Sequence, residues 1–368
     1  MNLQFGKFSI TQNSPVLIVA ELSDGHQGDL EHAKKLVKAA KDAGADVAKF
    51  QMHFPEEEMT AGVKMWAGDL QEILKKVWFS PENHSAIMRY CEEIGIQYLC
   101  TPFSPKAIDV LNEMGVDGFK TGSGEVYNLP FHRKLAKISA RTGKPVFIST
   151  GMCVLDELEE TVSIYREEGG YFMLMNCTSE YPIKDYSNAR LGLIPKLREK
   201  FGVLVGQSDH TTDSYTAFAA AALGAKVIEK HFTLDRNGSF PDDSMSFDPR
   251  MMKELVSGIR KIEEAVKVSD KIVTAEEKET RSWAFHSIVA NADLRAGDAL
   301  TLDNVRTARP GWGIPAKYLD KKYSTEILGR RFNKNINKNT LIRWEDLSFD
   351  RLRMVSEVES EAQPSQYD

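Results

Sequence analysis

Two lysines lie inside otherwise apolar runs of strand length. Lys49 lies in ADVAKFQ and Lys120 in GFKTGSGE, where a cation removed from water needs a charged or polar partner. Short hydroxyl side chains occur in the same or neighbouring runs: Thr101, Ser123, Ser149 and Ser208. Ammonium and hydroxyl donors together suit a ligand that carries a phosphate and a carboxylate. The alternative is structural: lysines that pair with strand-end carboxylates, and hydroxyls that bond local backbone.

Two histidines, His210 and His231, end consecutive apolar runs. Neighbouring strands lie about 4.8 Å apart, so both imidazoles can reach one divalent metal, with carboxylates and water as further ligands. Such a ligand set suits manganese, iron or zinc. Glu21 ends the first run, and His26, just after it, is expected over the same mouth. His53 follows the second run, and its role stays open.

Strands must bring these residues to one place, and the apolar runs have the length and composition of strands. Longer stretches with helical spacing stand between the runs, for example 30–43, 81–95 and 214–223. Near-continuous apolar strands that alternate with helices indicate a parallel sheet. Eight of them predict a closed (β/α)₈ TIM barrel, which carries its catalytic groups at the carboxyl ends of the strands. The runs are 16–21, 45–51, 96–103, 118–125, 145–150, 171–177, 203–210 and 227–233.

The pattern changes near residue 268, which predicts a catalytic barrel over 1–268. The segment 269–283 is polar and has no apolar periodicity, so we expect a linker there. Short β-type runs separated by glycine and proline predict a small, mostly β domain over 284–350. The tail, 351–368, is polar and acidic and is expected to be disordered.

Composition limits the classes of partner. The formal net charge is −6, which argues against nucleic acid and anionic membranes, because both need a basic face. The four cysteines form no close CxxC pair, so we expect buried, reduced thiols rather than a zinc or redox motif. No signal-peptide pattern opens the chain and no apolar stretch is long enough to span a bilayer. A cytoplasmic protein is expected.

In these residues and their order the chain resembles the sialic acid synthase family, which includes synthases of N-acetylneuraminate, legionaminate and pseudaminate. The resemblance covers residues 15–348. A single GSGE would be weak support, whereas an ordered set of motifs at expected strand ends is strong. The motifs are VAELSDGHQG, AKFQMH, TPFS, FKTGSGE, STGM, CTSEYP, GQSDHT, EKHFTLDR and RPGWGI.

The resemblance implies a phosphoenolpyruvate-binding barrel and a small antifreeze-like (SAF) domain. It also implies a swapped homodimer, in which each SAF domain caps the partner's barrel and Arg309 reaches the sugar. Glu21, Lys49, Lys120 and Arg309 match catalytic positions, and His210 and His231 match the ligands of a divalent metal, expected to be Mn²⁺ with Mg²⁺ or Co²⁺ as alternatives. The positions that match the phosphoenolpyruvate pocket are Lys49, Thr101, Lys120, Ser123, Ser149, Ser179 and Ser208. Those that match sugar contacts are Gln51, Glu125, Tyr181, Asp242 and Arg309.

The implied reaction joins phosphoenolpyruvate to open-chain N-acetylmannosamine, giving N-acetylneuraminate and phosphate by C–O cleavage. Four departures from the family pattern leave the acceptor sugar open. Gly25 and Ser179 each stand where asparagine is frequent, Phe240-Pro241-Asp242-Asp243 replaces a common Gly-Pro-Asp-His, and Trp312 is bulky beside Arg309.

Three alternatives follow. The first is a legionaminate or pseudaminate synthase that uses a di-N-acetylated 6-deoxyhexose. The second is a metal-dependent hydrolase, which would need a two-metal site and further strand-end histidines. The third is a non-catalytic sugar-binding protein, which would be expected to have lost Glu21, Lys49 or a metal histidine.

Overall fold

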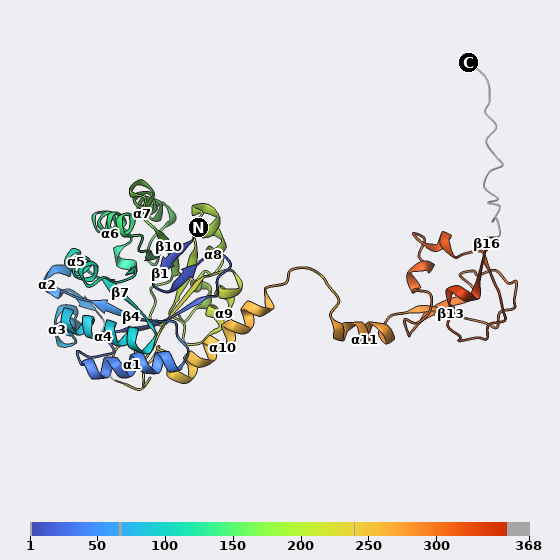
Figure 1. The fold of residues 1–368 in the computed structure, drawn as a ribbon, viewed down its shortest axis with the longest axis horizontal. Helices are drawn as coiled ribbons and strands as arrows, with labels where there is room; N and C mark the ends of the chain where they lie inside the picture. Colours follow the sequence, from blue (N-terminus) through green and yellow to red (C-terminus); the bar gives the residue numbers. More distant parts are fainter. Residues whose placement is uncertain (1, 66–67, 239, 352–368) are drawn as a thin grey trace, which may run out of the picture. The chain divides into compact units, whose positions relative to one another are not determined.

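The computed structural model describes residues 2–65, 68–238 and 240–351. The chain divides after Val268 into two compact units, and Figure 1 shows the elements of each. None of the described helices is long and apolar enough to cross a membrane.

The first unit is built on eight parallel strands in the spatial order β7-β4-β3-β12-β11-β10-β9-β8. The two end strands, β7 and β8, lie side by side, so the sheet curls into a near-closed barrel and the predicted (β/α)₈ fold is confirmed. The strands are β3 (Leu17–Ser23), β4 (Val47–Met52), β7 (Gln97–Pro102), β8 (Phe119–Thr121), β9 (Val146–Ser149), β10 (Phe172–Cys177), β11 (Val205–Asp209) and β12 (Val227–His231).

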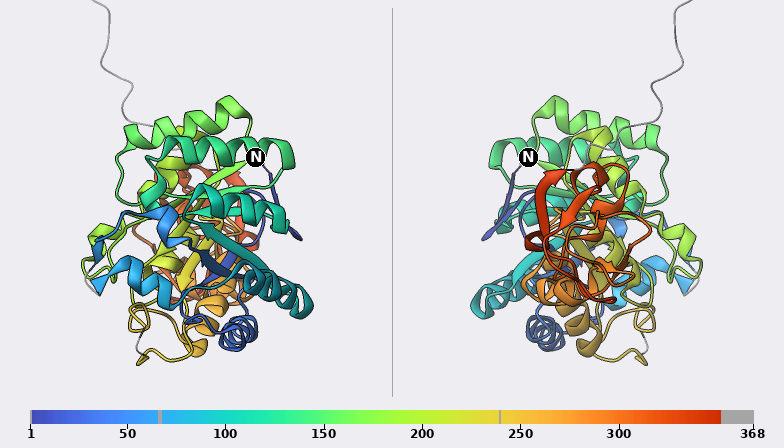
Figure 2. Two further views of the ribbon diagram at one scale, coloured as in Figure 1. Left: turned by 90° about the vertical axis from the view of Figure 1, so that its left-hand side faces the viewer. Right: turned by 90° about the vertical axis from the view of Figure 1, so that its right-hand side faces the viewer.

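Helices form a layer around these strands, as Figure 1 and Figure 2 show. They are α1 (Leu30–Asp42), α4 (Pro81–Ile94), α5 (Pro105–Met114), α6 (Leu129–Thr142), α7 (Leu155–Glu168), α8 (Leu193–Phe201), α9 (Tyr215–Ala222) and α10 (Pro249–Ala265). Local signals set their ends: Ser80 caps α4 by accepting from Asn83 N, and Gly95 ends it with φ +76°, a left-handed conformation that suits glycine.

The interior of the barrel changes from apolar to polar along each strand. Leu17 and Val19 belong to an apolar layer, and Glu21, the next residue with the same orientation, is polar. The hairpin β1 (Leu3–Phe5) and β2 (Phe8–Ile10) packs its apolar side chains into this layer. The hairpin was not among the predicted elements; its apolar contacts fill the amino-terminal part of the barrel and leave the polar groups at the carboxyl ends.

The second unit has short antiparallel pairs, β13 (Ser287–Ala290) with β14 (Val305–Ala308) and β15 (Arg330–Phe332) with β16 (Leu347–Arg351). They surround a small apolar core of their own. Before them, the expected linker contains a helix, α11 (Ala275–Ala284), whose residues are not buried. A helix that buries no face needs no apolar periodicity, so the sequence signal for α11 was the capping box of Thr274 and Glu277. The predicted disordered tail lies outside the described residues, except for Arg351.

Candidate active site

A cavity of about 470 Å³ opens at the carboxyl ends of the barrel strands. The strand register brings its polar residues together: Glu21 lies opposite Lys49 across β3 and β4, and opposite His231 across β3 and β12. Among the expected site residues, all but Ser179 and Arg309 line this cavity. Those that line it are Glu21, Lys49, Gln51, Thr101, Lys120, Ser123, Glu125, Ser149, Tyr181, Ser208, His210, His231 and Asp242.

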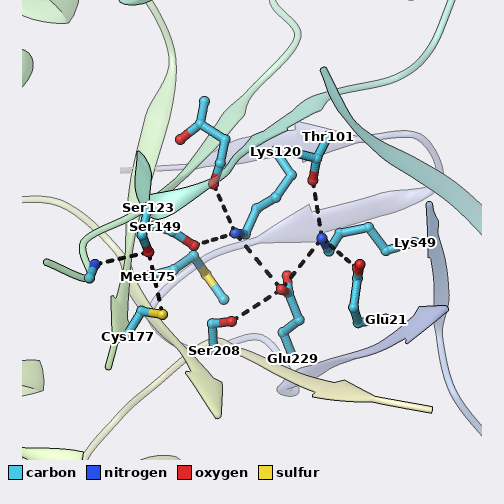
Figure 3. A network of polar contacts seen from close by, with 12 residues as sticks. Glu21, Lys49, Thr101, Lys120, Ser123, Ser149, Met175, Cys177, Ser208 and Glu229 are labelled. Atoms are coloured by element: carbon cyan, nitrogen blue, oxygen red, sulfur yellow. Dashed lines mark hydrogen bonds and ion pairs between the residues drawn. The ribbon is translucent and has the colours of Figure 1, made fainter. Parts of the chain in front are cut away.

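Lys49 is buried among oxygen atoms. Its Nζ lies 2.5 Å from Glu21 Oε2 and 3.5 Å from Glu229 Oε1, and it donates to Thr101 Oγ1 at 3.1 Å, as Figure 3 shows. Burial by itself would lower the pKa of Lys49, but the carboxylates of Glu21 and Glu229 outweigh burial and raise it. Lys49 is therefore a protonated, positively charged side chain inside the barrel.

Lys120 faces Glu229 from the other side. Its Nζ lies 3.8 Å from Glu229 Oε1 and donates to Ser149 Oγ, and Ser208 Oγ donates to the same Glu229 oxygen at 3.1 Å. Burial would raise the pKa of Glu229, but Lys120 and Lys49 hold it below its usual range. Two ammonium groups and two carboxylates thus form a buried, neutral set, which we call the charge quartet: Glu21, Lys49, Lys120 and Glu229.

A cradle of small polar groups adjoins the quartet at Gly151. A Cβ at this position would collide with the hydroxyl oxygens of Ser123 and Ser179, and Gly151 N donates to Ser123 Oγ at 3.1 Å. Ser179 Oγ is buried without a hydrogen-bond partner within the described part of the chain, although Ser179 is not among the residues that line the cavity. Ser123 lies on a 3₁₀ turn, η1 (Ser123–Glu125), because β8 ends at Thr121; the expectation that Ser123 and Glu125 belong to the strand is wrong.

The two predicted metal-binding histidines are neighbours. The ring centroids of His210 and His231 lie 5.4 Å apart. His210 Nδ1 contacts the carbonyl oxygen of Thr178 at 2.7 Å and must donate, so in the neutral ring the lone pair is on Nε2. His231 Nδ1 is buried without a hydrogen-bond partner in the ranges described. Within those ranges no group of three or more His, Cys, Asp or Glu side chains is placed to hold a metal.

The expected sugar-contact residues border the quartet and the histidines. Gln51 Nε2 donates to Glu21 Oε1 at 2.8 Å, and the Tyr181 ring lies 4.3 Å from the His210 ring. Asp242 Oδ2 lies 3.5 Å from His231 Nδ1. Burial raises the pKa of Glu125, and its carboxylate accepts from Asn128 at 2.7 Å. These side chains form a second polar region beside the charge quartet.

Several charged residues of the cavity were not among the predicted site residues. Glu229 alternates with His231 in VIEKH, and this spacing of two was the signal for a second inward side chain. Asp24, His53 and Glu58 also line the cavity, and burial raises the pKa of Asp24 to about 6. Asp24 and Glu58 lie outside regular strands, where no periodicity marks the direction of a side chain.

One wall of the cavity is apolar. Its residues come from the segment after β4, with α3 (Leu70–Lys76), from Phe103 after β7 and from the loop after β12. The wall consists of Met59, Leu70, Ile73, Leu74, Phe103, Phe240 and Pro241. A ligand in this cavity therefore meets both charged groups and aliphatic or aromatic carbon.

Two residues that were expected at the mouth of a barrel do not line this cavity. His26 is fully buried beside Phe79, with ring centroids 4.3 Å apart, and is not among the residues that line the cavity; its expected position over the mouth is wrong. Arg309 belongs to the second unit, where its guanidinium lies 6.0 Å from the Trp283 ring. Its reach to a sugar stays a prediction.

Comparison with known proteins places this geometry in a family. Residues 36–271 match the NeuB family and residues 285–348 match the SAF domain. The N,N'-diacetyllegionaminic acid synthase of Campylobacter jejuni is 35% identical, over 89% of this chain and 98% of its own. The pseudaminic acid synthase of Helicobacter pylori is 32% identical, over 90% and 98%. The crystal structure of the N-acetylneuraminic acid synthetase of Leptospira borgpetersenii superposes with a TM-score of 0.69 at 30% identity, over 76% of this chain and 95% of that one. The chain therefore belongs to the NeuB family and is an enzyme of the group that makes sialic, legionaminic and pseudaminic acids.

Proposed function

We propose that this enzyme condenses phosphoenolpyruvate with N-acetylmannosamine to form N-acetylneuraminate and inorganic phosphate. The observation that carries the proposal is the charge quartet inside a rim of hydroxyl groups, beside two histidines that fit a metal. Phosphoenolpyruvate is a small polyanion with a phosphate and a carboxylate. Two buried ammonium groups with several hydroxyl donors suit both of its anionic ends.

In this proposal the anion lies between Lys49 and Lys120. Hydroxyl donors around them hold its oxygen atoms, and the Ser179 hydroxyl gains the partner that it lacks among the described residues. The amino sugar occupies the region bordered by Gln51, Glu125, Tyr181 and Asp242. The hydroxyl donors are Thr101, Ser123, Ser149, Ser179 and Ser208.

The chemistry follows from this placement. The methylene carbon of phosphoenolpyruvate forms a bond to the aldehyde carbon of the open-chain sugar, water adds at the carbon that bears phosphate, and that carbon loses its bond to the phosphate oxygen. Glu21 stabilises the cationic carbon and accepts the proton of the attacking water. His210 and His231 would hold a divalent metal, expected to be Mn²⁺, with Mg²⁺ or Co²⁺ as alternatives, which supplies Lewis acidity at the aldehyde.

The proposal includes an assembly. A cytoplasmic homodimer would place each SAF domain over the partner's barrel, where Arg309 orients the sugar and helps to exclude water. Such a lid would limit the water in the site to the molecule that adds at the cationic carbon.

The apolar wall favours a second acceptor. Met59, Ile73 and Phe240 offer carbon surface to a methyl group, and a di-N-acetylated 6-deoxyhexose has more methyl groups than N-acetylmannosamine. A buried methyl group stabilises binding by about 0.8 kcal/mol. The legionaminic and pseudaminic acid synthases named above are 35% and 32% identical to this chain. The synthesis of a legionaminic or pseudaminic acid is therefore the second candidate.

The test is phosphate release from phosphoenolpyruvate in the presence of Mn²⁺. Release that requires N-acetylmannosamine, and that is lost in Glu21→Gln, is the expected result. A panel that adds the di-N-acetylated 6-deoxyhexose decides between acceptors, and much faster release with that sugar would replace the first candidate by the second. No sugar-dependent release with any hexosamine would overturn both.

A further inference from the structure

His53 lies in the loop after β4 with polar partners on both ring nitrogens. Nδ1 is 2.9 Å from Glu58 Oε2, and Nε2 is 3.1 Å from Gln51 Oε1 and 3.6 Å from Asp24 Oδ2. The ring stacks on Phe103 with centroids 4.5 Å apart, and the side chain is only 9% exposed. Packing and hydrogen bonds thus hold the imidazole in one orientation.

The direction of each hydrogen bond identifies the charge of the ring. The carboxylate of Glu21 can only accept, so Gln51 donates its Nε2–H to Glu21 Oε1 at 2.8 Å. The Gln51 carbonyl oxygen therefore faces His53, and His53 Nε2 must donate to it. The carboxylate of Glu58 also accepts, so Nδ1 must donate as well. Both nitrogens carry protons only in the imidazolium form.

We propose that His53 is a positioning residue for Glu21, acting through Gln51: its imidazolium holds the Gln51 amide with the NH₂ group toward the catalytic carboxylate. This inference rests on the proposed function only in the role of Glu21, not in the geometry. If His53 is absent, the Gln51 oxygen loses its donor and only the hydrogen bond to Glu21 holds the amide, so the Gln51 oxygen can turn toward Glu21 more readily. That arrangement favours a protonated Glu21, which cannot accept the proton of the attacking water.

The electrostatic surroundings of His53 agree with this charge. Burial alone would lower the pKa of His53, but Asp24 and Glu58 outweigh burial and raise it, with Glu21 adding to the effect. His26 and His84 lie close enough to interact electrostatically with His53, and burial lowers the pKa of each to about 3. Both are therefore neutral, and His53 is the cation that balances the carboxylates around it.

A direct test needs no turnover. The ¹⁵N shifts of the His53 imidazole, measured in the full-length protein with labelled histidine, should show both nitrogens protonated at pH 7. In Glu58→Gln the amide oxygen can still accept from Phe54 N, as Glu58 does, but the charge is removed, so His53 should lose its proton at a lower pH. Glu57→Gln, the preceding and exposed residue of α2 (Pro55–Glu58), is the matched control and should leave the titration unchanged. A His53 ring that is neutral at pH 7 in the wild type would overturn the proposal.

A second experiment separates positioning from general structural support. His53→Phe keeps a ring beside Phe103 but has no donor, so kcat should fall by roughly 10–100-fold, the range for residues that orient a reactive group. The Kd for phosphoenolpyruvate, measured by calorimetry, should stay within about twofold, because no quartet residue contacts His53 directly. His53→Gln has an NH₂ donor for the Gln51 oxygen and should recover part of kcat.

Wild-type kcat in His53→Phe, or His53→Gln no faster than His53→Phe, would contradict positioning through Gln51. Loss of phosphoenolpyruvate affinity in His53→Phe would indicate a structural role instead and would equally count against the proposal. If the wild type shows no turnover with any acceptor, the proposed function fails, and the ¹⁵N measurement still decides the charge of His53.

Discussion

Replacement of Glu229 by glutamine tests the charge quartet most directly. Glutamine has the same shape and can still accept from Ser208, but it removes the negative charge that lies 3.5 Å from Lys49 and 3.8 Å from Lys120. Lys49 keeps Glu21 as a partner. Lys120 keeps hydrogen bonds to Ser149 and Thr121 O but loses the carboxylate nearest to it.

The magnitude follows from the distances and from burial. At an effective dielectric constant of about 20, each of the two attractions amounts to roughly 4–5 kcal/mol before desolvation is subtracted. Removing one partner of a buried ion pair costs about 3–5 kcal/mol in measured cases. We therefore expect the free energy of unfolding of the barrel to fall by about 3–5 kcal/mol, a large part of the roughly 5–15 kcal/mol of a typical domain.

Inorganic phosphate supplies the second half of the test. A dianion that enters the quartet replaces the missing negative charge, so millimolar phosphate should stabilise Glu229→Gln more than it stabilises the wild type. The assay is thermal and urea unfolding of the full chain, with and without phosphate. Glu31→Gln is the control, because Glu31 forms only an exposed pair with Lys34, and a change within about 0.5 kcal/mol is expected. Unchanged stability of Glu229→Gln, or a larger effect of phosphate on the wild type, would refute the counter-ion reasoning.

Four further changes test other parts of the site and the core. Glu21→Gln should abolish sugar-dependent phosphate release while far-UV circular dichroism stays unchanged, and wild-type rates would exclude its catalytic role. His210→Ala should retain less manganese after dialysis, measured by elemental analysis, and undiminished metal would argue against the histidine pair. Arg309→Ala should lose turnover without a change in barrel stability, whereas Arg306→Ala, on β14 of the same unit, should not; equal activity of the two variants would exclude a role for Arg309. Burial lowers the pKa of His84 to about 3, so the unfolded chain takes up a proton below pH 6.5 that the folded chain resists, and stability falls as the pH falls. In His84→Phe the unfolding free energy between pH 6.5 and pH 4 should decline less steeply, by about 1.4 kcal/mol per pH unit, and parallel curves would contradict this.

The strand pattern and the chemistry at the strand ends could be predicted from the sequence. Alternation along a strand places every second side chain on the same face, so the run that ends in Lys49 and Gln51 had to direct both toward one side. Near-continuous apolar runs between helices then indicated a parallel barrel, and the barrel put these side chains at a common mouth. Lys49 and Lys120 were found by this reasoning because each interrupts an apolar run, and His210 and His231 because each ends one.

The partners of these residues could not be predicted in the same way. His53 continues the alternation of Lys49 and Gln51 just past the end of β4, but its significance depends on Glu58 and Asp24, which lie in other segments. The β1–β2 hairpin consists of strands of three residues each, too short for a pattern of alternation, although it fills the amino-terminal part of the barrel. Helix α11 buries nothing, so no apolar stripe marked it.

The sequence by itself determined which residue types stand at the ends of eight strands, and hence the class of ligand that they could bind. Only the tertiary structure decided which of these residues become neighbours and form ion pairs. Glu21 and His231 become neighbours because β3 pairs with β12, and Glu229 lies near both Lys49 and Lys120 because side chains from separate strands meet in the interior of the barrel. Barrel closure and register are collective properties of all eight strands, since each pairing depends on the next, and no local stretch of sequence contains them.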